Sequence, residues 1–293
     1  MRVGFVGTGN MGRPMAANIL KAGHQLTVWD LRHEATRELE NLGATRANDL
    51  PALSSAVRVT LLSLPNDAIV EKVVFGDGGP GLMAGAHAGD VIFDLSTVSP
   101  ATTRRLSERA AAKGVRLIDA PVSGSVSGAQ AGTLAVMIGA SKDVIAPFEA
   151  VLRAIGTNLF CLGEVGRGNV LKLLNNLVAL TNQAALCEAM ALADRLGVPR
   201  ATVGEVVGKS SGASFILDRK LAALVEHDYQ AGFFVDLARK DLGLALDLAE
   251  SVGARTALVR EAWKLYGEAS AAGFGTLDSC GLLNLLEPTP ARQ

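Results

Sequence analysis

The sequence of 293 residues is poor in cysteine, in net charge and in long apolar runs. Its three cysteines, Cys161, Cys187 and Cys280, are odd in number and far apart, so neither a disulfide framework nor a metal site is expected. The formal net charge is -1, with Lys and Arg spread along the chain, which leaves no electrostatic case for nucleic acid or an anionic membrane surface. Charged or polar residues interrupt every apolar run before it could span a bilayer.

The opening residues "MRVGFVGTGN" lack the longer apolar core and the cleavage site of a signal peptide, so the expected location is the cytoplasm. Hydrophobic residues make up 49% of the chain and charged residues 19%. That composition favours a folded protein with a substantial core and argues against disorder. The length suits one large domain or two ordinary ones.

Short β-branched runs alternate with helical patterns through the first half of the chain. The predicted strands are residues 2–6, 25–29, 58–63, 90–95 and 115–120. Strands and helices that alternate at this spacing indicate an α/β fold, a Rossmann-type doubly wound parallel sheet with helices on both faces. Two further strands, at 134–139 and 158–163, are expected to complete the sheet.

The pattern changes at Gly166, where one uninterrupted helix of about twice the usual length begins. Only helical stretches are predicted after it. The chain is therefore divided into an α/β domain, residues 1–161, and an all-helical C-terminal domain, residues 162–293. The long helix would join the two domains.

"VGFVGTGNMGRPMAANIL" places three glycines between the first strand and a helix. Gly7 permits the tight turn, Gly9 lets the backbone approach a pyrophosphate, and Gly12 allows close packing of helix on strand. The helix N-terminus then offers unpaired N–H groups to the phosphates. The residues predicted to contact the cofactor here are Gly7, Thr8, Gly9, Asn10, Met11 and Gly12. A glycine turn without a nucleotide is the alternative reading.

The second strand ends at Asp30, eighteen residues after Gly12, close to the ~20 expected for the acid that binds the adenosine ribose. A carboxylate there repels a 2′-phosphate and favours NAD. Arg32, just beyond the strand, could hold such a phosphate, so NADP is not excluded.

"GRGNVLKLLNN", residues 166–176, puts a lysine into an otherwise apolar helix. Residues three and four apart share a helix face, so Asn169, Lys172, Asn176 and Gln183 form a polar stripe. Buried polar groups need partners, and a bound substrate would supply them. A lysine that snorkels at a helix edge is the structural alternative.

Four segments together resemble the β-hydroxyacid dehydrogenase family, which includes 3-hydroxyisobutyrate dehydrogenase and tartronate semialdehyde reductase. They are "FVGTGNMGRPMAANI", "DAPVSGSVSGAQAGTL", "GRGNVLKLLNN" and "RKDLGLALDLA". The four lie in the family's order and spread across almost the whole chain. The resemblance implies an NAD(P)-dependent oxidoreductase that interconverts a small β-hydroxy acid and its semialdehyde by hydride transfer.

The resemblance also implies the roles of individual residues. Lys172 matches the catalytic lysine, a general acid and base. The residues that match the family's substrate-binding positions are Ser123, Gly124, Asn176, Phe233 and Asp241. Those that match positions beside the cofactor are Leu64, Pro65, Thr97 and Lys240. By composition alone, the segment around Ser123 would also fit a flexible Ser/Gly loop.

One departure concerns the substrate segment, which usually reads Ser-Gly-Gly, whereas Ser125 replaces the second glycine and Ser127 adds a hydroxyl. The added Cβ constrains the backbone, so the pocket would suit a different side group on the substrate.

The alternative functions are an imine-reductase-like enzyme of the same fold, which generally lacks the lysine, and a dinucleotide-binding protein without turnover. A decarboxylating 6-phosphogluconate dehydrogenase would need a longer helical domain.

The apolar circumference of the long helix predicts a homodimer or homotetramer.

Overall fold

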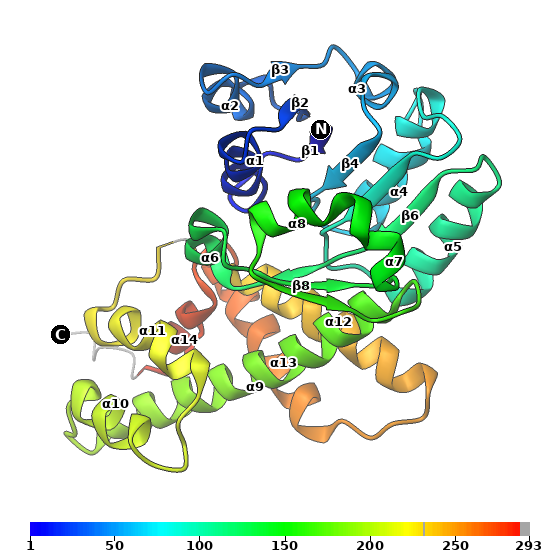
Figure 1. The fold of residues 1–293 in the computed structure, drawn as a ribbon. Coiled ribbons are helices and arrows are strands. Elements are labelled where there is room, and N and C mark those ends of the chain that lie inside the picture. Colours follow the sequence, from blue (N-terminus) through cyan, green and yellow to red (C-terminus); the bar gives the residue numbers. More distant parts are fainter. Residues whose placement is uncertain (231, 288–293) are drawn as a thin grey trace. The chain divides into compact units, whose positions relative to one another are not determined.

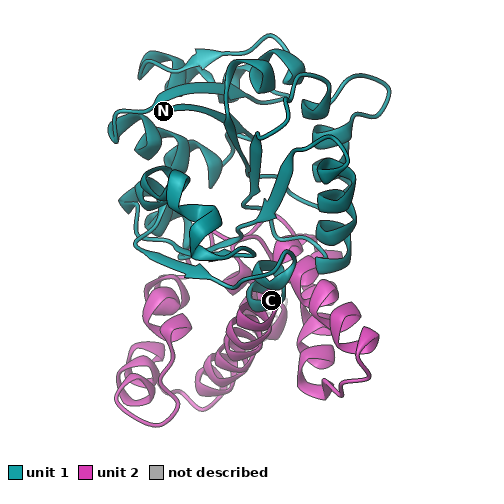
Figure 2. Ribbon diagram, turned by 45° about the vertical axis from the view of Figure 1, so that its right-hand side comes forward, with its two compact units in different colours: residues 1–172 teal, residues 173–293 magenta. Residues whose placement is uncertain are grey.

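The computed structural model describes residues 1–230 and 232–287. Contacts within the chain divide it into two compact units, unit 1 (residues 1–172) and unit 2 (residues 173–293), shown in different colours in Figure 2. Because one helix runs through the division, the two units share a continuous backbone there. The predicted domain boundary after residue 161 stays a prediction. No helix among the described residues is long and apolar enough to cross a membrane.

Unit 1 is built on a six-stranded sheet in the order β3-β2-β1-β4-β5-β6, in which every neighbouring pair is parallel (Figure 1). Its strands are β1 (Arg2–Val6), β2 (Gln25–Trp29), β3 (Thr45–Arg46), β4 (Val59–Leu62), β5 (Val91–Asp94) and β6 (Arg116–Asp119). The five predicted strands and the doubly wound parallel sheet are confirmed. β1 and β4 are neighbours from which the strand order runs outward in both directions, so the switch point of the sheet lies between them.

The last strands of unit 1 do not complete that sheet, and here the prediction was wrong. β7 (Val122–Ser123), β8 (Ala135–Ile138) and β9 (Asn158–Cys161) form a separate three-stranded sheet. β7 and β8 are antiparallel, and β8 and β9 are parallel. A hydrophobic pattern predicts strands but cannot assign them to a sheet, because strands pair through backbone groups and a short apolar run does not show which strand is its neighbour.

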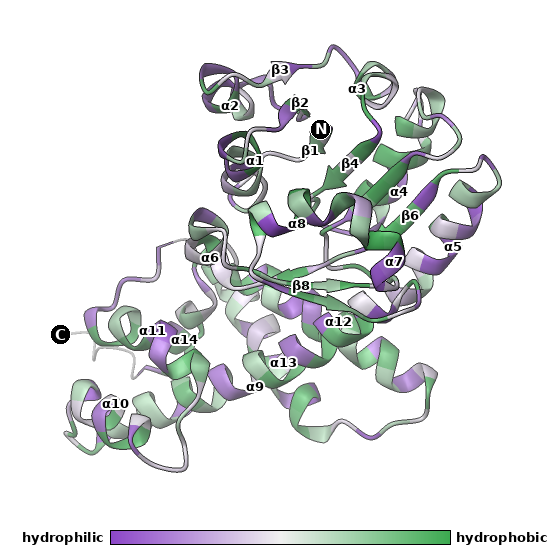
Figure 3. Cartoon of the chain, in the orientation of Figure 1, coloured by the Kyte–Doolittle hydropathy of each residue, from purple (hydrophilic) through white to green (hydrophobic). Residues whose placement is uncertain are grey.

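Helices cover the sheets of unit 1. They are α1 (Gly12–Lys21), α2 (Arg37–Asn41), α3 (Leu50–Ala56), α4 (Asp67–Phe75), α5 (Pro100–Ala111), α6 (Ser125–Ala131), α7 (Lys142–Ile145) and α8 (Glu149–Ile155), with short 3₁₀ turns η1 (His33–Ala35), η2 (Leu82–Ala84) and η3 (Ala146–Phe148). The side chain of Asn66 caps α4, and that of Ser99 caps α5 ahead of Pro100. Strand β4 is hydrophobic and buried along its length, whereas α5 is largely hydrophilic (Figure 3).

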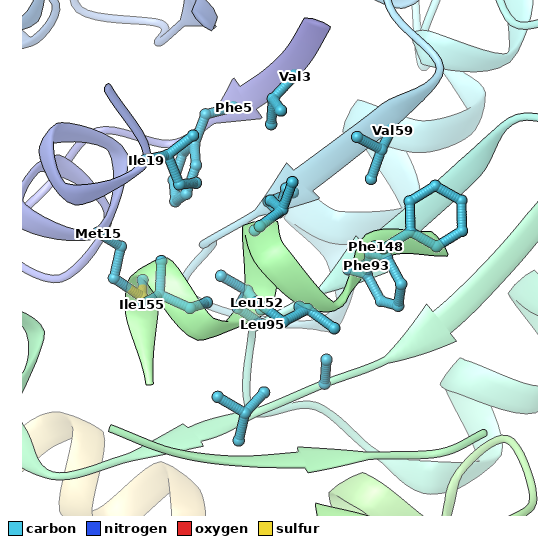
Figure 4. Packing of buried hydrophobic residues seen from close by; sticks show 14 of the residues in the cluster. Val3, Phe5, Met15, Ile19, Val59, Phe93, Leu95, Phe148, Leu152 and Ile155 are labelled. Carbon is cyan, nitrogen blue, oxygen red and sulfur yellow. The ribbon is translucent and has the colours of Figure 1, made fainter. Parts of the chain in front are cut away.

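The main core of unit 1 fills the space between the large sheet, α1 and α8 (Figure 4). Phe5 of β1 packs there with Met15 and Ile19 of α1, all three fully buried. Phe93 meets Phe148 edge to face, with ring centroids 5.6 Å apart. This packing holds the start of α1 on β1, which is the position that the glycine loop requires.

Unit 2 is helical, as predicted. α9 (Arg167–Arg195) begins in unit 1 and continues into unit 2, and the elements that follow are α10 (Arg200–Gly208), α11 (Phe215–Glu226), α12 (Val235–Ser251), α13 (Ala257–Ala269), η4 (Ser270–Phe274), η5 (Ser279–Leu282) and α14 (Leu283–Leu286). Tyr266 is the largest fully buried side chain of its core. Within the described residues, the only pairing of strand type after α9 is one isolated bridge, between Phe234 and Asp278.

The circumference of α9 is only partly buried within the protomer. Leu171, Leu174 and Val178 lie along one face of the helix and are 40%, 48% and 56% exposed. Leu192 near its end is 58% exposed. The apolar circumference of the long helix is thus larger than one protomer covers, and the homodimer or homotetramer predicted from it stays a prediction.

Candidate active site

The glycine loop joins the carboxyl end of β1 to the first turn of α1. Gly7 has a φ of +88°, which favours glycine, and a Cβ on Gly12 would lie 1.8 Å from the Gly7 carbonyl oxygen. Nothing lies within 4 Å of the position of a Cβ on Gly9, so the loop leaves open space there. An open turn at a helix N-terminus beside the switch point of the sheet fits the pyrophosphate of a dinucleotide.

Asp30 lies beside this loop, as its position after β2 predicts. Its Oδ2 accepts a hydrogen bond from the Thr8 backbone N–H at 2.8 Å, and its Oδ1 accepts from the Arg32 N–H at 2.9 Å. A carboxylate has about four acceptor positions, so capacity for ribose hydroxyls remains. The exposed Arg32 guanidinium lies 3.9 Å from the same carboxylate, where it would be available to a 2′-phosphate.

The loops after β4 and β5 are held together. The Leu64 N–H donates to Ser96 Oγ at 2.9 Å, and the Ser99 N–H donates to Asp67 Oδ1 at 2.9 Å. Pro65 and Thr97 lie in these two loops, so three of the four residues predicted beside the cofactor, Leu64, Pro65 and Thr97, share one edge of the sheet. That edge carries the strand carboxyl ends, where ligands bind in folds of this kind.

Ser123 is the last residue of β7, Gly124 is the N-cap of α6, and both are partly buried. Ser125 follows with a φ of +63°, one of two described residues other than glycine with a positive φ. Its hydroxyl lies 2.9 Å from that of Ser127. The serine in place of glycine is thus held in a left-handed conformation that costs energy and is typical of functional loops.

The first turn of α9 is anchored on a buried carboxylate. Asp119, the last residue of β6, accepts hydrogen bonds from the N–H groups of Gly166 at 2.7 Å and Asn169 at 2.8 Å. Gly168 packs so closely that a Cβ would lie 2.2 Å from the Met137 carbonyl oxygen. The "GRGN" motif is therefore explained by capping and close packing at the start of the helix that carries Lys172.

The polar stripe on α9 divides into two kinds of residue. Asn169 and Gln183 are fully buried and have protein partners: Asn169 bonds Val98 and Thr103, and Gln183 bonds Ser279 and Cys280. The expectation that a ligand satisfies them is wrong. Lys172 and Asn176, the two residues of the stripe that were predicted to bind substrate, are 7% and 6% exposed and lie one turn apart.

In unit 2, Asn176 forms a group with two residues of α12, the buried Asp241 and the partly exposed Lys240. Its Nδ2 donates to Asp241 Oδ2 at 2.6 Å, and the Lys240 Nζ forms an ion pair with Asp241 Oδ1 at 2.9 Å. Asp241 is 1% exposed. Phe233 lies before α12, where its N–H donates to Asp278 Oδ2 at 3.0 Å, and its ring packs against the core of unit 2.

Two buried acidic residues at this edge of the sheet were not predicted from the sequence. Asp94 and Asp119 are register partners at the ends of the neighbouring strands β5 and β6. Burial raises the pKa of Asp94 to about 7, and burial also raises the pKa of Asp119 although backbone N–H groups oppose it. An acid at the end of an apolar strand was the available signal for both. Among residues 1–230 and 232–287, no group of His, Cys, Asp or Glu could hold a metal ion.

Two family models cover most of the chain. The NAD binding domain of 6-phosphogluconate dehydrogenase matches residues 2–163, and the NAD-binding model of NADP-dependent 3-hydroxyisobutyrate dehydrogenase matches residues 166–286. Both descriptions name a nicotinamide dinucleotide as the cofactor, one for a model that matches the glycine loop and the other for a model that matches the helical part of the chain.

Similar proteins cover almost the full length. A 3-hydroxyisobutyrate dehydrogenase of Pseudomonas aeruginosa is 39% identical over 92% of this chain and 93% of its own length. A 2-(hydroxymethyl)glutarate dehydrogenase of Eubacterium barkeri is 36% identical over 98% of this chain and 95% of its own. The crystal structure of a 3-hydroxyisobutyrate dehydrogenase from Salmonella typhimurium has a TM-score of 0.89 at 30% identity and covers 97% of this chain and 99% of that one. The chain therefore belongs to the β-hydroxyacid dehydrogenase family of NAD(P)-dependent oxidoreductases.

Proposed function

We propose that this enzyme interconverts a small β-hydroxy acid and its semialdehyde, with Lys172 as the general acid and base. The observation that carries the proposal is a lysine only 7% exposed on α9, with Asn176 one turn further along the same face. An amide one turn from a lysine on the same helix face offers a hydrogen-bond donor to the molecule that exchanges a proton with the lysine. Relatives named for a hydroxy acid substrate, the 2-(hydroxymethyl)glutarate and 3-hydroxyisobutyrate dehydrogenases, support the choice of reaction.

When bound, the nicotinamide dinucleotide supplies the hydride donor or acceptor. The N–H groups at the start of α1 bind its phosphates, and the carboxylate of Asp30 accepts hydrogen bonds from its adenosine ribose. Asp30 also repels a 2′-phosphate, so we propose NAD as the preferred cofactor. Leu64, Pro65, Thr97 and Lys240 line the cofactor in this proposal.

The substrate carboxylate is bound by the Ser123 hydroxyl and the backbone at Gly124. In reduction, the Lys172 ammonium donates a proton to the carbonyl oxygen and stabilises its developing charge. In oxidation, the neutral amine accepts the hydroxyl proton. Asn176 has a second N–H besides the one given to Asp241, and that N–H donates to the substrate. Phe233 and Asp241 support the site.

We also propose a homodimer or homotetramer in the cytoplasm. The exposed face of α9 formed by Leu171, Leu174 and Val178 supports assembly, because a second copy would remove it from water. Sedimentation at several protein concentrations measures the assembly directly, and a monomer at all of them would contradict it.

A cofactor absorbance assay over small β-hydroxy acids, their semialdehydes and cyclic imines tests the reaction. Turnover of one or more β-hydroxy acids is the expected result. Turnover of imines alone would favour the imine-reducing alternative. A folded protein that binds NAD and turns over nothing would favour a dinucleotide-binding protein without catalysis.

A further inference from the structure

We propose that Asn169 is a positioning residue for the reaction, because its side chain locks the first turn of α9 to the loop that carries Thr97. The proposal rests on the roles proposed above for Lys172 and Thr97. Asn169 touches neither substrate nor cofactor in this account. It acts through the two segments that it joins.

Three hydrogen bonds link Asn169 to three parts of unit 1. Its Oδ1 accepts from the Val98 backbone N–H at 3.2 Å, and its Nδ2 donates to Thr103 Oγ1 at 3.1 Å. Its own backbone N–H donates to Asp119 Oδ2 at 2.8 Å. The side chain is 0% exposed, so water does not compete for these bonds. One residue thus connects the loop after β5, helix α5 and the end of β6.

The two ends of this connection lie next to the chemistry. Val98 directly follows Thr97 in the chain, and Lys172 lies three residues after Asn169 on the same helical face. Thr103 Oγ1 also donates to the Ser99 carbonyl oxygen at 3.3 Å, so a second residue of the same loop is held. The position of the Lys172 backbone relative to the Thr97 backbone is therefore set through Asn169.

The side-chain amide suits this task because it offers an acceptor and a donor at once. Leucine has neither, and a carboxylate lacks the donor and would lie beside Asp119. Gln183, on the same helix, is a matched case for comparison: it is 1% exposed and donates to Ser279 Oγ at 2.9 Å. Gln183 lies eleven residues beyond Lys172, and its side chain donates to Ser279 and Cys280, both in unit 2.

The test compares Asn169→Ala with Gln183→Ala in single-turnover hydride transfer, at saturating cofactor and substrate. A misplacement of about 1 Å at a reacting centre costs on the order of 10²-fold in rate. We expect Asn169→Ala to slow hydride transfer by about that factor and to raise the deuterium isotope effect on kcat, with cofactor affinity unchanged. Gln183→Ala should lower the resistance to denaturant and leave the hydride-transfer rate and the deuterium isotope effect at their wild-type values.

Thr103→Val keeps the shape of the side chain and removes the hydroxyl that accepts from Asn169 Nδ2 and donates to the Ser99 carbonyl oxygen. Both bonds belong to the connection between α9 and the Thr97 loop, so this variant decides the question if Asn169→Ala does not fold. It should slow hydride transfer in the same direction by a smaller factor. A wild-type transfer rate in folded Asn169→Ala, or equal slowing in Gln183→Ala, would overturn the positioning role alone. A wild-type enzyme inactive toward all hydroxy acids would instead refute the proposed function and this role with it.

Discussion

Asn176 of α9 donates a 2.6 Å hydrogen bond to the buried carboxylate of Asp241, whose other oxygen pairs with Lys240. This contact orients the Asn176 amide one turn from Lys172 on the same helix. In the proposed mechanism the second N–H of the amide donates to the substrate, and an amide that is already held in place loses less entropy on binding.

Asn176→Leu should weaken substrate use without weakening cofactor binding. A hydrogen bond to a charged or developing anion is worth ~1.5–3 kcal/mol, so we expect kcat/KM to fall by one to two orders of magnitude. Steady-state kinetics and fluorescence titration with NADH measure the two effects. An equal loss of NADH affinity would show that Asn176 serves the cofactor or the fold instead.

Lys172→Met should abolish most turnover, because methionine keeps an unbranched stem but has no proton to exchange. General acid–base catalysis contributes about 10²- to 10⁴-fold, and we expect kcat to fall within that range while NADH still binds. Lys113→Met, at an exposed lysine after α5, is the control and should keep wild-type kinetics. Unchanged kcat in Lys172→Met would refute the proposed mechanism.

Asp30→Ser should move cofactor preference from NAD toward NADP. The substitution removes the charge that repels a 2′-phosphate and leaves Arg32 beside the site. We expect the ratio of kcat/KM for NADPH over NADH to rise about tenfold or more, which is ~1.4 kcal/mol. Adding Arg32→Ala should lower that ratio again. A wild-type enzyme that already prefers NADPH would contradict the assignment of NAD.

Ser125→Gly should change both stability and substrate preference. A residue other than glycine in the left-handed region costs about 1–2 kcal/mol, so relief of the φ of +63° should raise the free energy of unfolding by about 1 kcal/mol. Loss of the hydroxyl should favour β-hydroxy acids with an apolar side group over those with a polar one. Ser127→Ala, which removes the hydroxyl partner, should change the preference in the same direction without the stability gain. If the ratio of kcat/KM for the apolar over the polar substrates is the same in the wild type and both variants, this loop does not contact the substrate side group.

Asp94→Asn should flatten the dependence of stability on pH. Burial holds the folded-state pKa of Asp94 at about 7, so between about pH 4 and 7 the folded protein keeps a proton that the unfolded chain has lost. The free energy of unfolding therefore declines as pH rises through that window, by up to ~1.4 kcal/mol per unit, and levels off above it. Urea unfolding at several pH values measures the slope.

Asn at position 94 can still accept from the Ser96 N–H, so the variant should fold and lack this part of the slope. Asp143→Asn, at an exposed acid in the first turn of α7, should keep the wild-type slope. A slope equal to wild type in Asp94→Asn would place the titrating group elsewhere.

The sequence by itself determined the doubly wound sheet, the long helix α9, the glycine loop and the family. These depend on local patterns, because strand and helix periodicity, glycine spacing and a lone lysine in an apolar helix are visible in short windows. The placement of Asp30 beside the loop also followed from its distance along the chain, since β2 must run parallel to β1.

Only the tertiary structure decided which polar residues have protein partners. Asn169 and Asn176 look alike in the sequence, yet one bonds Val98 and Thr103 inside unit 1, and the other bonds Asp241. The second sheet of β7, β8 and β9 and the capping of α9 by Asp119 were equally invisible. Each depends on a contact between residues distant in the chain. The hydrogen-bond partner of a buried side-chain amide or carboxylate cannot be inferred from the residues next to it in the sequence.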